Sequence, residues 1–214
     1  MIESLLFLLP LLLLSVVVHE VAHGVAAEWW GDPTARMLGR ITLSPLPHID
    51  LFGSILVPGL LLLTGSGVLF GWAKPVPVTP QNYRDRKWGD ITVSLAGPAS
   101  NVALAGGLAG VLVAVGWLTG GNIPRIVWMV GSYGIFLNFI LAVFNLIPIP
   151  PLDGSHVVAN LLPPRAAYAY RSMGQIGLFI VLGLLFLLPG ALGWVFLPAQ
   201  VATGALLGMV TALT

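Results

Sequence analysis

The chain has 214 residues, of which 57% are hydrophobic and only 8% are charged, and its mean hydropathy is +0.96. Soluble domains carry about 25% charged residues, so this composition excludes an ordinary soluble fold and indicates an integral membrane protein embedded in a lipid bilayer. The net charge of +1 with no long basic run gives no sign of nucleic-acid binding, and the lack of cysteine excludes thiolate metal sites and disulfides.

The apolar segments are about 20 residues long, which suits membrane-spanning helices rather than the short strands of a β-barrel. We therefore predict an all-α polytopic membrane protein that forms a single membrane-embedded domain over 1–214. The first segment is interpreted as a retained span, because it lacks the basic start and the small-residue cleavage site of a signal peptide. The six predicted apolar segments are 2–30, 51–70, 91–117, 126–147, 172–189 and 193–213.

The first span contains His19-Glu20-Val21-Ala22-His23. Polar side chains are costly at bilayer depth, so this cluster requires a partner or a function. Residues four apart share one helix face, and His19 and His23 could therefore bind one metal ion. Glu20 is a candidate general base for a water at that metal. Histidines on helices of soluble proteins are often merely hydrogen-bonded, but the cost of burying them in a membrane favours metal binding here.

The next segments surround a possible turn of the chain within the membrane. Residues 36–43 alternate in part, which predicts a short strand or ribbon. Segment 51–70 is apolar but interrupted by Pro58-Gly59 and by a Gly-rich stretch. Loop 71–90 holds four Lys and Arg side chains, and its prolines keep it extended. This loop is either a gate for substrates or a fixed linker at the membrane interface.

Segment 51–70 decides the topology. If it crosses the membrane fully, the polar ends of the first span and of span 126–147 lie on opposite faces, and Asp153 cannot meet His19. If it enters and returns, both ends lie on one face, together with eight of the nine Lys and Arg, and only Arg125 lies opposite. The positive-inside rule favours this second arrangement and makes that face cytoplasmic. The expected fold is five full transmembrane helices plus a re-entrant or ribbon element.

Two imidazoles do not complete a catalytic zinc site, which usually has three protein ligands and one open position. Glu28 points away from the pair, because it follows His23 by five residues on the same helix. Asp153 follows a proline-rich turn that can direct a carboxylate inward. The full set of candidates for the third ligand is Glu28, His48, Asp50, Asp153 and His156.

Several other polar residues have two possible roles. His48 and Asp50 either regulate or contact the metal, or they cap the ribbon and bond backbone groups near the mouth of the site. His156 either orients Asp153 or belongs to an interfacial helix. Asn101 lies inside a span, where an interhelical hydrogen bond and a catalytic role are equally open.

The HExxH motif in the first span, together with FNLIPIPPLDG at 144–154, resembles the site-two protease family of intramembrane metalloproteases. Residues 71–77 and 95–101 match further family motifs, and 39–50 is similar to bacterial members. The resemblance covers a catalytic core of about 15–160 and leaves 172–213 as accessory helices. Family members often carry a PDZ or CBS domain, for which this chain has no room. The family loop more often reads Asp-Gly-Gly-Arg, whereas Ser155-His156 follow Gly154 here.

This resemblance implies one zinc ion per chain, held by His19, His23 and Asp153. It also implies that Glu20 is the general base and that Asn145 holds the substrate or its oxyanion. The implied substrates are single-span membrane proteins whose cleavage releases a regulator, such as an anti-sigma factor, at a bacterial inner membrane with the site facing the cytoplasm. We expect ribbon 36–43 to pair with the unwound substrate as an added strand.

Two functions of other classes compete with this interpretation. A metal-ion transporter or channel could use the His/His/Asp cluster as a transit site, but such proteins usually show repeated halves or polar residues along several spans. A non-catalytic binder of membrane proteins would need no base beside the metal, and Glu20 argues against it. The interpretation favoured by the sequence is an intramembrane zinc endopeptidase.

Overall fold

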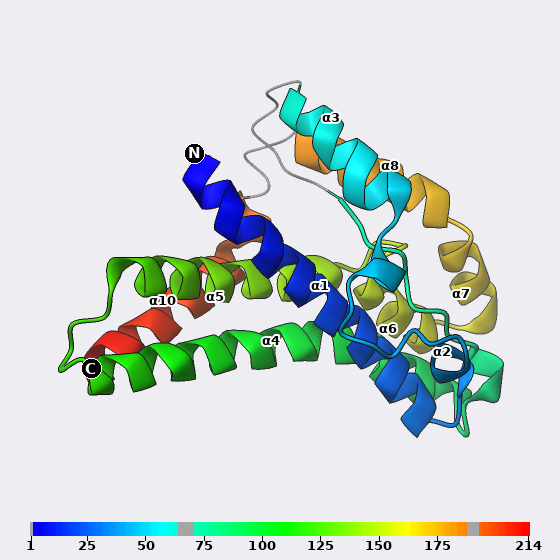
Figure 1. Cartoon of the computed structure of the whole chain (residues 1–214). Coiled ribbons are helices and arrows are strands. Elements are labelled where there is room, and N and C mark those ends of the chain that lie inside the picture. Colours follow the sequence, from blue (N-terminus) through cyan, green and yellow to red (C-terminus); the bar gives the residue numbers. More distant parts are fainter. Residues whose placement is uncertain (1, 64–70, 188–192) are drawn as a thin grey trace.

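The computed structural model describes residues 2–63, 71–187 and 193–214, and every regular element in these ranges is helical. Figure 1 shows the elements in chain order. They are α1 (Ile2–Trp29), α2 (Thr34–Met37), η1 (Leu46–His48), η2 (Leu51–Leu56), α3 (Val57–Leu63), η3 (Pro80–Asn82), α4 (Arg86–Leu118), α5 (Arg125–Asn145), α6 (Asp153–Leu161), α7 (Pro164–Arg171), α8 (Gly174–Leu187) and α10 (Leu197–Leu213).

Three of the described helices are long and apolar enough to cross a membrane, namely Leu8–Trp29, Arg86–Leu118 and Arg125–Asn145. This confirms an all-helical integral membrane protein, while the number of five full spans stays a prediction. The 33 residues of α4 correspond to about 50 Å, which exceeds a hydrocarbon core of about 30 Å. Because the charges of α4 cluster in its first turns, we place that end at the membrane interface.

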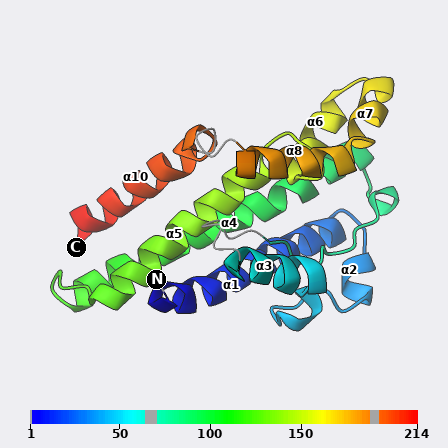
Figure 2. The ribbon, with the colours of Figure 1, turned by 90° about the horizontal axis from the view of Figure 1, so that it is seen from above.

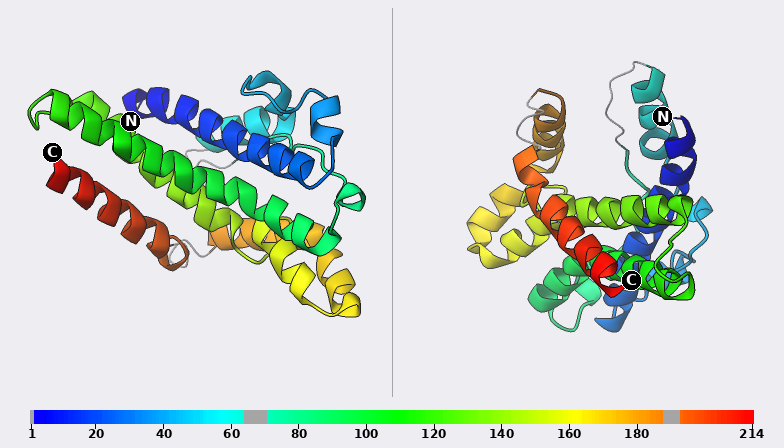
Figure 3. Two further views of the ribbon diagram at one scale, coloured as in Figure 1. Left: turned by 90° about the horizontal axis from the view of Figure 1, so that it is seen from below. Right: turned by 90° about the vertical axis from the view of Figure 1, so that its left-hand side faces the viewer.

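The centre of the molecule is the antiparallel pair α4 and α5, with α1 packed across α4 and α10 packed along α5 (Figures 2 and 3). Asp85 caps the start of α4, because its side chain accepts a hydrogen bond from the Trp88 N–H at 2.9 Å. Small residues let the helices approach closely, and the buried core combines Ala105, Ala109, Leu112, Ile135 and Val210.

The end of α1 is fastened to the segment that leads into α4. Asp32 is fully buried and accepts hydrogen bonds from the backbone and hydroxyl of Thr34, the Thr79 N–H and the Asn82 amide. Burial acts to raise the pKa of Asp32, but these hydrogen bonds outweigh it and lower the pKa below its usual value. The Arg84 N–H also donates to the Trp30 carbonyl at 2.9 Å.

The predicted ribbon at 36–43 is wrong. Residues 34–37 form the helical turn α2, and the residues that follow it to position 43 form turns, bends and irregular backbone rather than a strand. Pro33 favours a helical turn after it, and Gly39 ends the turn with a φ of 64°. A short alternating pattern could not reveal these local signals. The predicted loop 71–90 is also shorter than expected, because α4 already begins at Arg86.

The residues that follow segment 51–70 are hydrogen-bonded to residues at its beginning. Asp50 caps η2 by accepting from the Phe52 and Gly53 N–H groups. The Trp72 N–H then donates to the Gly53 carbonyl at 3.1 Å, and the Lys74 N–H donates to the His48 carbonyl at 2.9 Å. These hydrogen bonds are those expected of a segment that enters and returns, although residues 64–70 lie outside the described residues.

Candidate metal centre

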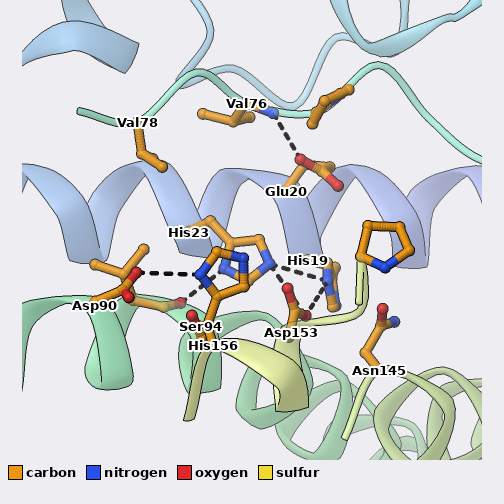
Figure 4. Close-up of a pocket in the computed structure, with 13 residues that line it drawn as sticks. His19, Glu20, His23, Val76, Val78, Asp90, Ser94, Asn145, Asp153 and His156 are labelled. Carbon is orange, nitrogen blue, oxygen red and sulfur yellow. Dashed lines mark hydrogen bonds and ion pairs between the residues drawn. The ribbon is translucent and has the colours of Figure 1, made fainter. Parts of the chain in front are cut away.

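Three side chains from two distant segments converge at the junction of α1 and α6. His19 and His23 lie one turn apart on α1, and their Nε2 atoms are 3.1 Å apart. The Asp153 Oδ2 atom, at the start of α6, lies 3.2 Å from His19 Nε2 and 3.4 Å from His23 Nε2. Figure 4 shows the three side chains turned toward one another. One ligand atom from each residue lies within 4.8 Å of the others, so the group could hold a metal ion.

The hydrogen bonds of the two Nδ1 atoms determine which ring nitrogen of each imidazole is free to bind a metal. His19 Nδ1 lies 2.7 Å from the Asn101 side-chain oxygen, and His23 Nδ1 lies 2.7 Å from the Val93 carbonyl. Both partners are acceptors, so each Nδ1 carries the hydrogen and each neutral Nε2 presents a lone pair. Asp153 Oδ2 is buried and accepts no hydrogen bond. Three electron-pair donors therefore converge with no hydrogen between them, which fits a bound cation.

Helix α4 forms the wall against which the two imidazoles rest. Val93, Gly97 and Asn101 are spaced by four residues and so share one face of this helix. A Cβ atom at Gly97 would lie 2.5 Å from His19 Cε1 and 2.5 Å from His23 Nε2. Only glycine lets α4 come close enough for Val93 and Asn101 to bond the rings on either side.

The direction of Asp153 follows from the chain before it. Helix α5 ends at Asn145, and the prolines at 148, 150 and 151 prevent it from continuing. Helix α6 then begins at Asp153. Gly154 is required at this tight reversal, because a Cβ atom there would lie 2.2 Å from the Leu146 carbonyl oxygen.

A buried polar network continues from the site into the bundle. The Asn101 amide donates to the Asn138 side-chain oxygen at 2.9 Å, and the Asn138 amide donates to Ser15 Oγ at 3.0 Å. All three residues are buried. Asn101 therefore links helices and orients His19 at the same time. Sequence reasoning missed Asn138 and Ser15, although an amide inside the apolar span 126–147 was a usable signal.

The three converging side chains line a cavity of about 270 Å³ that also contains the two residues predicted to act in catalysis. Glu20 Oε2 accepts a hydrogen bond from the Val76 N–H at 2.8 Å. Figure 4 shows Glu20 turned toward Val76, whereas the histidines turn toward Asp153. Asn145 uses one N–H to bond the Leu141 carbonyl at 2.9 Å, which leaves its second N–H for a ligand.

The extended segment 72–79 covers one side of this cavity, and we call it the strap. Arg40 Nη2 donates to the carbonyls of Lys74 at 2.9 Å and Pro75 at 3.2 Å. Ser54 Oγ donates to the Trp72 carbonyl at 2.9 Å. With the Val76 bond to Glu20, these contacts hold the strap in place along the cavity.

The other ligand candidates from the sequence bond other groups. Glu28 forms a two-point ion pair with Arg36 at the surface. His48 is buried, with Nε2 at 3.1 Å from the Thr42 carbonyl, and Asp50 caps η2, so both serve backbone groups. His156 lines the cavity but bonds Asp90 at 3.3 Å rather than Asp153. Asp90 was not singled out from the sequence.

Comparison with known proteins places the chain in a family. The profile of peptidase family M50 matches residues 119–188, a region that includes Asn145 and Asp153. The chain is 37% identical over 188 residues to the Bacillus subtilis protein named "Putative zinc metalloprotease YwhC", across 86% of this chain and 81% of that protein. The chain belongs to peptidase family M50. It is therefore an enzyme that hydrolyses peptide bonds, and a member of the site-two protease family that its motifs resemble.

Other M50 relatives come from mycobacteria. The protein named "Putative zinc metalloprotease Rip2" from Mycobacterium tuberculosis is 33% identical over 184 residues, across 86% of this chain and 68% of the relative. Its counterpart in Mycolicibacterium smegmatis is 32% identical over the same length. No solved structure matches the chain at a significant level.

Proposed function

We propose that this M50 peptidase is a zinc endopeptidase that cleaves transmembrane protein substrates within the bilayer. The observation that carries the proposal is the convergence of two Nε2 lone pairs and one buried carboxylate oxygen in a cavity that also holds a glutamate. His19, His23 and Asp153 would hold one zinc ion per chain, which is a ligand number typical of catalytic zinc sites. The names of the relatives, zinc metalloproteases, agree with this choice of metal.

Zinc, when bound, supplies a Lewis acid that lowers the pKa of a water and polarises a carbonyl. The chain's own residues do the rest. The Val76 N–H fixes one oxygen of Glu20, which leaves Oε1 to take a proton from the attacking water. The same carboxyl group then passes the proton to the nitrogen of the leaving amine. The second N–H of Asn145 would hydrogen-bond the carbonyl oxygen as it gains negative charge.

The membrane sets one further requirement. Carbonyl groups within a transmembrane helix are already hydrogen-bonded along that helix, so the substrate would unwind locally before its peptide bond reaches the cavity. Substrates of this kind include single-span membrane proteins whose cleavage releases a regulator, which is regulated intramembrane proteolysis. The substrate binds in the space between the strap and α4.

The topology belongs to the same proposal. The domain 1–214 has five full spans and a re-entrant element, with a catalytic core of about 15–160 and accessory helices over 172–213. The hydrogen bonds of Trp72 and Lys74 to residues 53 and 48 support the re-entrant path. With eight of nine Lys and Arg on the face that carries the cavity, the positive-inside rule directs the site to the cytoplasmic side of a bacterial inner membrane.

The test compares wild type with Glu20→Gln and with the matched control Glu28→Gln on the same helix. The full chain is purified in detergent, its zinc content is measured, and cleavage of β-casein and of a tagged single-span reporter is followed. We expect zinc in all three proteins, and a loss of roughly 100- to 10,000-fold in rate for Glu20→Gln alone. A zinc-free wild type, or undiminished cleavage by Glu20→Gln, would contradict the proposal.

Metal transport is less well supported than hydrolysis. Membership of a peptidase family favours cleavage. The cluster of His19, His23 and Asp153 is also confined to one depth, whereas a transit path requires polar groups along several spans.

A further inference from the structure

A second imidazole–carboxylate pair lines the same cavity as the zinc-binding candidates. His156 Nδ1, on α6, lies 3.3 Å from Asp90 Oδ1 in the first turns of α4. The other oxygen of Asp90 accepts from Asn160 Nδ2 at 2.6 Å and from Arg171 Nη2 at 3.3 Å. Asp90 is buried, whereas the His156 side chain is half-exposed. The mechanism above uses neither residue.

The geometry of α6 explains how His156 reaches the cavity. Asp153, His156 and Asn160 are spaced by three and four residues, so they form one stripe along the helix. At one end of this stripe Asp153 contacts the histidines of α1, and at the other end Asn160 bonds Asp90 on α4. His156 lies between them, and it lines the cavity with Glu20 and Asn145 (Figure 4).

The hydrogen-bonding pattern leaves one atom of His156 unused. Nδ1 faces a carboxylate, which only accepts, so Nδ1 carries a hydrogen. Nε2 has no partner among residues 2–63, 71–187 and 193–214. A half-exposed imidazole with its other nitrogen fixed by a buried carboxylate is a suitable donor to a ligand in the cavity.

We propose that His156, oriented by Asp90, is a further catalytic residue that donates a hydrogen bond from Nε2 to the carbonyl oxygen of the scissile peptide bond. The inference rests on the proposed peptidase mechanism. As the water oxygen bonds to the carbonyl carbon, the π electrons of the C=O bond move onto its oxygen. The imidazolium N–H stabilises that charge, and no covalent bond of His156 is broken. The π electrons return when the C–N bond breaks.

This role requires the protonated ring, because Nδ1 already gives its hydrogen to Asp90. The charged groups around the ring come from four elements. Asp90 on α4 stabilises the imidazolium, Arg171 at the end of α7 opposes it, and Asp153 on α6 and Glu20 on α1 line the same cavity. The charge of the ring should therefore contribute to the rate, and a permanent cation at this position should preserve that contribution.

The experiment uses the full zinc-loaded chain in detergent with β-casein as the probe. The variants are compared with wild type for zinc content, thermal unfolding, kcat and KM. His156→Gln removes the charged donor, and His156→Arg replaces it with a permanent cation. Asp90→Asn removes the orienting charge. Arg165→Gln, on the exposed side of α7, is the matched control for loss of a positive charge near this membrane face.

We expect His156→Gln to keep its zinc and its KM while kcat falls roughly 100-fold, the range found for loss of one oxyanion donor. His156→Arg should recover most of that loss. Asp90→Asn should lower kcat at unchanged zinc content, because the imidazolium loses the carboxylate that orients it, and Arg165→Gln should match wild type.

Two results would overturn the role of His156. The first is a kcat for His156→Gln within about threefold of wild type. The second is a kcat for His156→Arg that is no higher than that of an uncharged His156→Ala variant of equal zinc content, which decides the matter even if His156→Gln loses zinc or stability. The Glu20→Gln comparison keeps the two proposals distinguishable. If Glu20→Gln is inactive and His156→Gln is not, only the inference about His156 fails. If wild type cleaves no substrate, the peptidase mechanism fails first.

Discussion

Gly97 offers a sharp test of how α4 shapes the metal centre. In Gly97→Ala the new Cβ would lie 2.5 Å from His19 Cε1 and His23 Nε2, whereas ordinary contact begins near 3.4 Å. Something must therefore move by about 0.9 Å, the difference between those two distances. The rings are anchored on α4 through Val93 and Asn101, each by a bond of 2.7 Å. Whether the rings or the helix retreat, the same two hydrogen bonds lengthen.

A shift of this size stretches a 2.7 Å bond to about 3.6 Å, which is no longer a hydrogen bond. Loss of the outer partner of a metal-bound histidine typically lowers metal affinity about 10- to 100-fold. That factor corresponds to about 1.4 to 2.8 kcal/mol. We therefore expect Gly97→Ala to bind zinc at least tenfold more weakly than wild type, by the lower of these estimates, and to lose peptidase activity in parallel.

The matched control is Gly107→Ala on the same helix, where an added Cβ meets no atom of the described residues within 4 Å. It should bind zinc normally, and the better helix propensity of alanine should stabilise α4 by about 0.8 to 1 kcal/mol. Zinc affinity is measured by competition with a chelator in detergent, together with thermal unfolding and β-casein cleavage. If Gly97→Ala binds zinc as tightly as Gly107→Ala, the account of the α4 wall is wrong.

Two further substitutions test the supports of the site. Asn101→Leu removes the acceptor that holds His19 Nδ1, so zinc affinity in the chelator competition should fall about 10- to 100-fold; unchanged affinity would show that the tautomer does not depend on Asn101. Asp32→Asn tests the buried hydrogen bonds of Asp32 after α1, which outweigh burial and lower the pKa of this carboxyl below its usual value. A carboxyl whose folded pKa is depressed contributes stability above its unfolded pKa, near 3.9, and loses it as pH falls through the folded value. Wild type should therefore show a drop in Tm below about pH 4 that Asp32→Asn, already less stable at neutral pH, lacks; parallel Tm profiles for the two proteins would contradict this.

The long helices were predictable because their signals are local. Span 126–147 corresponds to α5 at Arg125–Asn145, and its end follows from the prolines that come next. Short elements were harder to predict from the sequence. The alternation at 36–43 predicted a ribbon, but Pro33 and Gly39 favour the turn α2 instead. The helices α6 and α7 were not among the predicted segments, because helices of nine and eight residues leave little periodicity to detect.

The candidate site was likewise predictable only in part. The composition by itself determined a membrane protein, and the spacing of His19 and His23 predicted a helix face that could bind a metal, because hydropathy and helical periodicity are properties of contiguous residues. The family motifs implied Asp153 as the third ligand, but only the tertiary structure brings Asp153, rather than Glu28, His48, Asp50 or His156, to that face. It also decided that Asn101, 82 residues beyond His19, orients the ring, and that Asp90 holds His156 at the cavity. Such contacts depend on how helices far apart in the chain pack together, and the sequence of one helix does not reveal which helix will pack against it.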